Sequence, residues 1–282
     1  MTKVLLSFGH GYSAQGLSRT LVPLGWDVLG TTRARDGLAG IAASGAQAVI
    51  WPGAPIEALL DRATHVLIST APTAEGCPVL GALKEAIAAR RGQFTWVGYL
   101  STTGVYGDHQ GGWVDETTPL APGTTRGQWR VRAEQDWQAM GLPLHIFRLA
   151  GIYGPGRGPF EKLRQGRARR IIKKNQVFSR IHVDDIAQVL AASIAKPDAG
   201  SVYNVCDDLA APPEDVIAYA AKLLGVPIPQ AENFVAAEMT PMARSFYSES
   251  KKVSNAKIKA ALGVILKYPD YRAGLQALLP AA

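Results

Sequence analysis

Short apolar runs alternate with longer amphipathic stretches along most of the chain. The apolar runs predict buried strands at Val4–Phe8, Asp27–Thr31, Ala48–Trp51, His65–Ser69, Thr95–Leu100, Leu144–Leu149 and Val202–Val205. The amphipathic stretches predict helices at Ser13–Leu24, Val79–Arg90, Gln128–Met140, Asp185–Ala195 and Glu214–Leu224. Strands that alternate with helices are typical of βαβ units and a parallel sheet. The pattern therefore predicts an α/β fold built on a doubly wound parallel sheet.

Glycines occupy the turn between the first strand and the first helix. Residues 9–14 read Gly-His-Gly-Tyr-Ser-Ala, which fits Gly-x-Gly-x-x-Gly/Ala. The first glycine permits a tight turn, the second lets a pyrophosphate approach the backbone, and the alanine allows close packing of helix and strand. The N–H groups that begin the helix then face the phosphates. This position predicts a Rossmann-type dinucleotide site. The expected cofactor contacts here are Gly9, Gly11, Tyr12, Ser13, Ala14, Thr70 and Ala71.

The end of the second predicted strand bears on which dinucleotide binds. An NAD site usually carries an acidic residue about 20 positions past the glycines. Thr32 and Arg33 take that place here, and Arg35 follows. An arginine can pair with a ribose 2′-phosphate through charge-assisted hydrogen bonds. We therefore predict NADP as the cofactor, with Arg33 and Arg35 on its 2′-phosphate. NAD, with these arginines on a solvated loop, is the alternative.

The segments after Gly156 depart from the regular alternation. They contain prolines and a last helix, for which we expect Ser254 as the N-cap and Gly263 as the stop. We expect residues 1–156, with about 178–206, to form the dinucleotide-binding Rossmann domain. Residues of about 157–177 and 207–282 would form a smaller C-terminal substrate lobe over the carboxyl edge of the sheet.

Composition and charge add one feature to this organisation. Hydrophobic residues are 47% and charged residues 19% of the chain, an ordinary globular balance. No apolar run resembles a signal peptide or a membrane span, so we expect a cytoplasmic protein. Cys77 and Cys206 are predicted to be reduced, and no spacing of cysteine and histidine predicts a metal site. The net charge is +7, and much of the excess lies between Arg157 and Lys174.

Four segments contain short sequence motifs that occur in a fixed order along the chain. They are Tyr99–Asp108 with Val-Tyr-Gly, Arg148–Arg157 with Ile-Tyr-Gly-Pro-Gly-Arg, Arg180–Ala187 with Ile-His-Val-Asp-Asp, and Tyr203–Val205. In this order they resemble landmarks of the extended short-chain dehydrogenases/reductases, which include nucleotide-sugar epimerases and dehydratases. The resemblance runs from about Val4 to Leu275 and implies an oxidoreductase, epimerase or dehydratase.

The resemblance also implies a catalytic Tyr-x-x-x-Lys pair, which this chain lacks. In the family the tyrosine moves a proton to or from the substrate oxygen while a hydride moves to or from nicotinamide. Alignment puts Arg126 at the tyrosine position, Arg130 at the lysine position, and Thr102 as the hydroxyl that bonds the same oxygen. An arginine stays protonated at neutral pH and cannot shuttle protons. Arg130 can still supply the positive charge of the lysine and hydrogen bonds to the cofactor ribose.

Three interpretations of this departure stay open. Another group supplies the proton, with Tyr106, Tyr153 and His182 as candidates because each lies on a landmark segment near the expected cleft. Alternatively, Arg126 binds an anionic substrate or stabilises a developing oxyanion. In the third interpretation the protein binds NADPH as a sensor or regulator and catalyses nothing.

The substrate is predicted only by class: small and polar, either anionic or resembling a nucleotide sugar. We expect Tyr153, Arg157, Arg180 and His182 to contact it, although Arg180 is shifted in register from the arginine that the family uses for a diphosphate. The basic segment predicts either a solvated face or an electropositive rim that attracts phosphate or carboxylate groups. It has no aromatic residue between Phe160 and Phe178, and no nucleic-acid reader motif is present.

Neither nucleic acid nor a membrane is therefore expected as a partner. A homodimer is possible through the helices at 79–90 and 128–140. Trp129 and Trp137 are candidate interface anchors on the second of these helices, with a place in the core as the alternative.

Overall fold

A seven-stranded parallel sheet forms the centre of the computed structural model, which describes residues 3–280. Its strands are β1 (Val4–Phe8), β2 (Asp27–Thr32), β3 (Gln47–Ile50), β4 (His65–Ile68), β5 (Trp96–Thr102), β7 (Leu144–Leu149) and β11 (Val202–Val205). Their spatial order is β11-β7-β5-β4-β1-β2-β3. The order reverses at β1, which pairs with both β2 and β4. The predicted doubly wound α/β fold is confirmed, and the predicted strands end within two residues of the observed ones.

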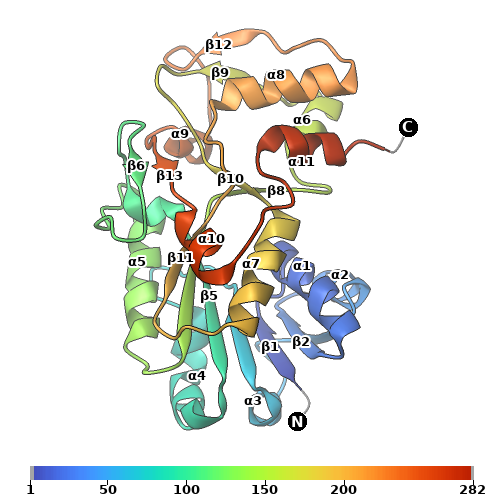
Figure 1. The fold of residues 1–282 in the computed structure, drawn as a ribbon, viewed down its shortest axis with the longest axis vertical. Coiled ribbons are helices and arrows are strands. Elements are labelled where there is room, and N and C mark those ends of the chain that lie inside the picture. The colour runs from blue at the N-terminus through green and yellow to red at the C-terminus, as the bar shows by residue number, and fades with distance from the viewer. Residues whose placement is uncertain (1–2, 281–282) are drawn as a thin grey trace.

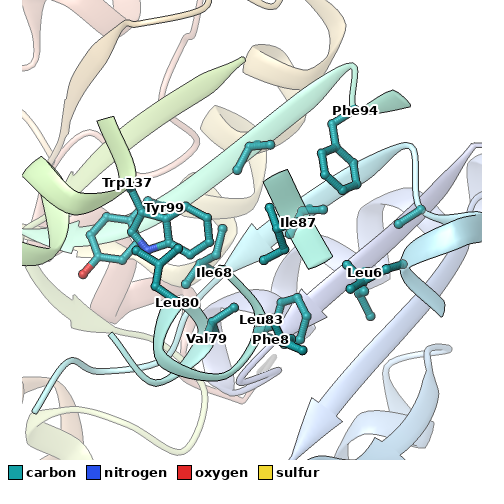
Figure 2. Packing of buried hydrophobic residues seen from close by; sticks show 14 of the residues in the cluster. Leu6, Phe8, Ile68, Val79, Leu80, Leu83, Ile87, Phe94, Tyr99 and Trp137 are labelled. Atoms are coloured by element: carbon teal, nitrogen blue, oxygen red, sulfur yellow. The ribbon is translucent and has the colours of Figure 1, made fainter. Parts of the chain in front are cut away.

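Helices cover both faces of this sheet (Figure 1). The helices that share a core with one face are α1 (Tyr12–Leu21), α2 (Gly37–Ala43), α7 (Val183–Ala195) and α10 (Ala256–Leu262). Those on the other face are α3 (Glu57–Arg62), α4 (Pro78–Ala88) and α5 (Thr125–Gln138). Successive strand residues point to opposite faces, so Leu5 and Leu6 belong to different clusters. Figure 2 shows the cluster on the face that α3, α4 and α5 cover, where Val79, Leu83 and Ile87 of α4 pack with Leu6 and Phe8 of β1.

The remaining elements lie beyond the carboxyl ends of the strands, at the top of Figure 1. They include α6 (Pro159–Arg164), α8 (Pro213–Leu224), α9 (Pro241–Phe246) and α11 (Tyr271–Ala277). Short strands pair here as β8 (Gly151–Tyr153) with β10 (Arg180–His182), β9 (Arg170–Ile172) with β12 (Ala231–Asn233), and β6 (Trp113–Val114) with β13 (Lys252–Val253). A separate core cluster joins α6, α8 and α11 through Phe160, Val216 and Leu275. We call the segments that build this cluster the upper lobe.

The C-terminal part of the chain corrects two expectations. Ile258 and Leu262 of α10 pack in the sheet cluster that also contains α1 and α7. This helix therefore belongs with the sheet and not with the smaller lobe to which 207–282 was assigned. Asn255 and not Ser254 is its N-cap, whereas Gly263 ends it in the left-handed conformation, as predicted.

Individual side chains bear on the other expectations. Trp137 is fully buried beside Tyr99, with 6.4 Å between ring centroids, and so is not an interface anchor. Trp129 is half-buried. Cys77 and Cys206 are both buried free thiols.

Among the helices of residues 3–280, none has both the length and the apolar character to cross a membrane.

Candidate active site at the carboxyl edge of the sheet

The glycine-rich turn has the geometry of an anion site. Gly9 has φ +72°, and a Cβ there would lie 2.9 Å from Thr70 Cγ2, so the position requires glycine. A Cβ at Gly11 would meet only the Gly9 carbonyl oxygen, at 3.8 Å. The space beside Gly11 is therefore open. Helix α1 begins directly after it, with no side-chain cap and no acidic residue in its first turn.

These features fit the phosphates of a dinucleotide. The N–H groups of the first turn of α1 can donate to an anion. Thr70 Oγ1 lies next to this turn, is buried, and has no hydrogen-bond partner in the described part of the chain. A buried hydroxyl without a partner is costly unless a ligand or water supplies one.

Arg33 and Arg35 follow β2 and are exposed. Neither forms an ion pair or side-chain hydrogen bond with another residue of 3–280. Their position at the carboxyl edge, directly after the strand next to β1, is compatible with the predicted 2′-phosphate contact. Ala71 is also exposed at this edge, whereas Ala14 is fully buried in the cluster beneath α1.

A cavity of about 1240 Å³ extends from the glycine-rich turn into the upper lobe. Tyr12, Ser13 and Ser69 line it beside the turn. The end of β5 and the start of α5 contribute Thr102 and Arg126 to its wall. Residues of α6, α8 and α9 also line it. One space therefore joins the candidate cofactor site to the residues that the sequence aligned with the catalytic positions.

Helix α5 presents two arginines to this cavity. The Arg130 guanidinium donates hydrogen bonds to the Tyr99 hydroxyl at 3.1 Å and the Leu100 carbonyl at 2.9 Å. Arg126 lies one turn earlier, is exposed, and has no side-chain partner among residues 3–280. The Thr102 hydroxyl lies at the end of β5 and accepts a hydrogen bond from the Gly104 N–H at 3.2 Å. Arg130 is thus held against β5, while the charge of Arg126 is available to a ligand.

Tyr106 does not lie where the sequence interpretation placed it. Its side chain is fully buried and is not part of the cavity wall. Its hydroxyl donates to Asn204 Oδ1 at 2.7 Å and accepts from the Arg148 guanidinium at 2.9 Å. Burial raises the pKa of this phenol. Tyr106 is therefore a structural residue and cannot reach a substrate.

His182 also does not contact the cavity, contrary to the sequence interpretation. It is 1% exposed and caps α7, with Nδ1 accepting from the Asp184 N–H at 3.2 Å. Burial lowers the pKa of its imidazole, and the side chain does not line the cavity.

Tyr153 is the third proton-donor candidate, and it does line the cavity. Its hydroxyl donates to the Asp270 carbonyl at 3.4 Å, and burial raises its pKa.

Arg157 and Arg180 both reach the cavity. The Arg180 guanidinium donates to the carbonyls of Phe178 and Ala211, at 2.9 and 3.0 Å. The exposed Arg157 guanidinium lies over the ring of Tyr12, with Cζ 5.5 Å from the centroid. The structure thus brings both arginines to the wall where the sequence predicted substrate contacts.

The wall of the cavity is strongly basic. Its acidic side chains are Glu238 and Glu249. Its basic side chains are Arg126, Arg130, Arg157, Lys162, Arg167, Arg169, Arg180 and Lys251. Arg169 pairs with Glu232, and Lys251 with Glu249 at 2.7 Å. Part of the basic segment at 157–174 therefore faces the cavity, as one of the two interpretations predicted.

Glu249 and Lys251 were not singled out by the sequence. Lys251 is 9% exposed and also donates to the Gly107 carbonyl at 2.7 Å. Glu249 Oε1 is buried and has no partner in the described part of the chain. The pair reaches the cavity through a contact between residues 144 positions apart, for which no local pattern exists. Residues 3–280 contain no group of three or more His, Cys, Asp or Glu side chains placed to hold a metal ion.

Comparison with known proteins finds relatives of this chain. The chain is 66% identical to a functionally unknown conserved protein from Silicibacter pomeroyi, with a TM-score of 0.95 and 98% of both chains covered. It is 29% identical to Protein YeeZ of Escherichia coli (strain K12), covering 96% of this chain and 97% of the relative. It shares the fold of a UDP-glucuronic acid 4-epimerase from Bacillus cereus in complex with NAD, at 18% identity and a TM-score of 0.77, with 97% and 94% covered. Residues 79–206 match the model of the NAD dependent epimerase/dehydratase family.

Proposed function

We propose that the protein is an NADP-dependent oxidoreductase, epimerase or dehydratase that acts on a small anionic substrate. The observation that carries the proposal is the continuous cavity that joins the glycine-rich turn to the basic wall. A substrate held by its negative charge at that wall would lie in the same space as a cofactor held at the turn. Nucleotide sugars, whose diphosphate matches such a wall, are one substrate class that fits.

The preference for NADP rests on Arg33 and Arg35. Residues 32–35 contain no carboxylate to bind a ribose 2′-hydroxyl, whereas two guanidiniums are available to a 2′-phosphate. The Bacillus cereus epimerase is in complex with NAD, so its likeness does not support NADP. The choice of cofactor is therefore argued from these two arginines alone.

The bound cofactor would supply or accept a hydride at its nicotinamide ring. The Thr102 hydroxyl would hydrogen-bond to the reacting substrate oxygen. Arg126 would hold the anionic group of the substrate or stabilise negative charge that develops on that oxygen. Arg130 would supply a fixed positive charge near the cofactor ribose. Tyr153 is the one of the three proposed proton donors that lines the cavity.

Two measurements test the proposal. NADPH should raise the melting temperature of the purified protein, and NADH should raise it less at equal concentration. Nicotinamide absorbance should then fall when an oxidoreductase is given NADPH with small keto acids or other small carbonyl compounds. An epimerase or dehydratase returns the hydride to its substrate in each turnover, so its action on nucleotide sugars should be followed by chromatography of the products. No thermal shift with either cofactor at millimolar concentration would overturn the proposal. A thermal shift without turnover of any compound would favour a sensor.

A further inference from the structure

The glycine-rich turn and the loop after β8 contact each other at the edge of the cavity. The Tyr12 hydroxyl donates a hydrogen bond to the Pro155 carbonyl at 3.0 Å. The Arg157 guanidinium lies over the Tyr12 ring, with 5.5 Å from Cζ to the centroid. A cation over an aromatic face is an attractive arrangement. These contacts connect the start of α1 to a loop at the base of the upper lobe.

The backbone conformation of residues 154–157 allows this contact to form. Gly154 and Arg157 exchange two backbone hydrogen bonds, of 2.9 and 3.0 Å. A Cβ at Gly154 would lie 2.5 Å from the Tyr12 hydroxyl, so a larger residue would push the two segments apart. Gly156 adopts φ +71° within the turn. The backbone thereby sets Arg157 beside the residue that begins α1.

No acidic side chain in the described part of the chain pairs with Arg157. Among residues 3–280 it forms no ion pair, and the first turn of α1 carries no acid. Tyr12 and Arg157 both line the cavity. The guanidinium and the N–H groups of α1 are therefore two positive features around one space. Thr70 Oγ1, buried and unpartnered, lies beside the same turn.

We propose that Arg157 is a clamp for the pyrophosphate of the bound dinucleotide. It would bind a phosphate oxygen beside the glycine-rich turn, while Tyr12 holds the guanidinium in place. A guanidinium suits this role because its fork of donors matches a phosphate. This assigns Arg157 to the cofactor instead of the substrate. The inference rests on the proposed function, because it requires a dinucleotide at the turn.

The experiment compares Arg157→Met with the wild type by isothermal titration calorimetry. Methionine keeps an unbranched side chain over Tyr12 and removes the charge. ADP-ribose contains the pyrophosphate but neither nicotinamide nor a 2′-phosphate, and 2′-AMP contains a 2′-phosphate but no pyrophosphate. We expect the Kd for ADP-ribose to rise about tenfold or more in Arg157→Met. The Kd for 2′-AMP and the melting temperature without ligand should be unchanged.

Arg164→Met is a matched control. Arg164 belongs to the same basic segment and also lies over an aromatic ring, with Cζ 5.6 Å from the Phe160 centroid. It is not part of the cavity wall. Its loss should leave both affinities unchanged. Tyr12→Phe keeps the ring and removes the bond to Pro155, and should weaken ADP-ribose binding less than Arg157→Met does.

The outcomes separate this inference from the proposed function. If the wild type binds neither probe, the dinucleotide site and the clamp both fail. If the wild type binds ADP-ribose and Arg157→Met binds it equally tightly, the clamp is wrong and the proposed function stands. Equal weakening of ADP-ribose and 2′-AMP would also overturn the clamp, since it would indicate a general effect of charge.

Discussion

Glu134 and Arg148 form an ion pair inside the protein, with 2.8 Å between Oε2 and the guanidinium and side-chain exposures of 3% and 6%. Glu134 also accepts a hydrogen bond from Ser101 at the end of β5. The pair joins α5 to β7 and so fixes the helix that carries Arg126 and Arg130. The orientation of the candidate active site therefore depends on charges buried beneath it.

Removal of one partner should destabilise the fold strongly. Arg148→Met leaves the Glu134 carboxylate buried and unpaired, which costs about 3–5 kcal/mol of unfolding free energy. Arg132 and Asp136 form an exposed pair on the same helix, at 3.9 Å, so Arg132→Met should change stability by about 0.5 kcal/mol or less. Urea unfolding of both variants measures the difference. Equal midpoints would contradict a structural role for the buried pair.

Two glycines of the same turn should respond differently to alanine. Gly9→Ala forces a side chain into positive φ and against Thr70, so it should lower the unfolding free energy by about 1–2 kcal/mol or more. Gly11→Ala meets no atom closer than 3.8 Å and should fold with nearly wild-type stability. Its methyl group would occupy the space that we assign to the pyrophosphate.

The measurement for the glycine pair combines melting temperature with NADPH affinity. Gly11→Ala should keep the melting temperature and bind NADPH at least about tenfold more weakly. Unchanged affinity in this variant would show that no phosphate approaches the backbone at Gly11. A fall in melting temperature as large as that of Gly9→Ala would show instead that the turn is packed and not open.

The fold could be predicted from the sequence because its signals are local. Each strand and helix is a run of neighbouring residues, and the glycine-rich turn occupies six consecutive positions. The site was less predictable because the direction of a side chain depends on distant partners. Tyr106 lies on a recognisable segment but turns inward to Asn204 and Arg148. His182 likewise turns inward, to cap α7.

The stability of the fold should depend on pH through the buried carboxyl group of Asp207. Its side chain is 2% exposed, and burial raises its pKa to about 8. In the unfolded chain an aspartate has a pKa of about 3.9. Between these two pKa values the folded protein holds a proton on Asp207 that the unfolded chain releases. The stabilisation that this proton gives the folded state is complete below about pH 4 and is lost as the pH rises through about 8.

Asp207→Asn tests this dependence because the amide has no proton to lose. Relative to the wild type, the variant should gain stability between about pH 5 and about pH 9. Urea midpoints of both proteins at the two pH values measure the gain. A stability difference that is the same at both values would mean that Asp207 does not titrate in this range.

The last prediction concerns Arg126 and Arg130 together. If α5 is placed as the family resemblance implies, Arg126→Tyr with Arg130→Lys restores a phenol and an ammonium opposite Thr102. A positioned acid contributes about 10²–10⁴-fold to rate, so the double variant should reduce small aldehydes or ketones with NADPH at least about 10²-fold faster than Arg130→Lys alone. That single variant is the matched control, since it keeps the charge, loses the bonds to Tyr99 and Leu100, and adds no phenol. A double variant that binds NADPH normally and gains no activity would show that residue 126 does not face the reacting substrate oxygen.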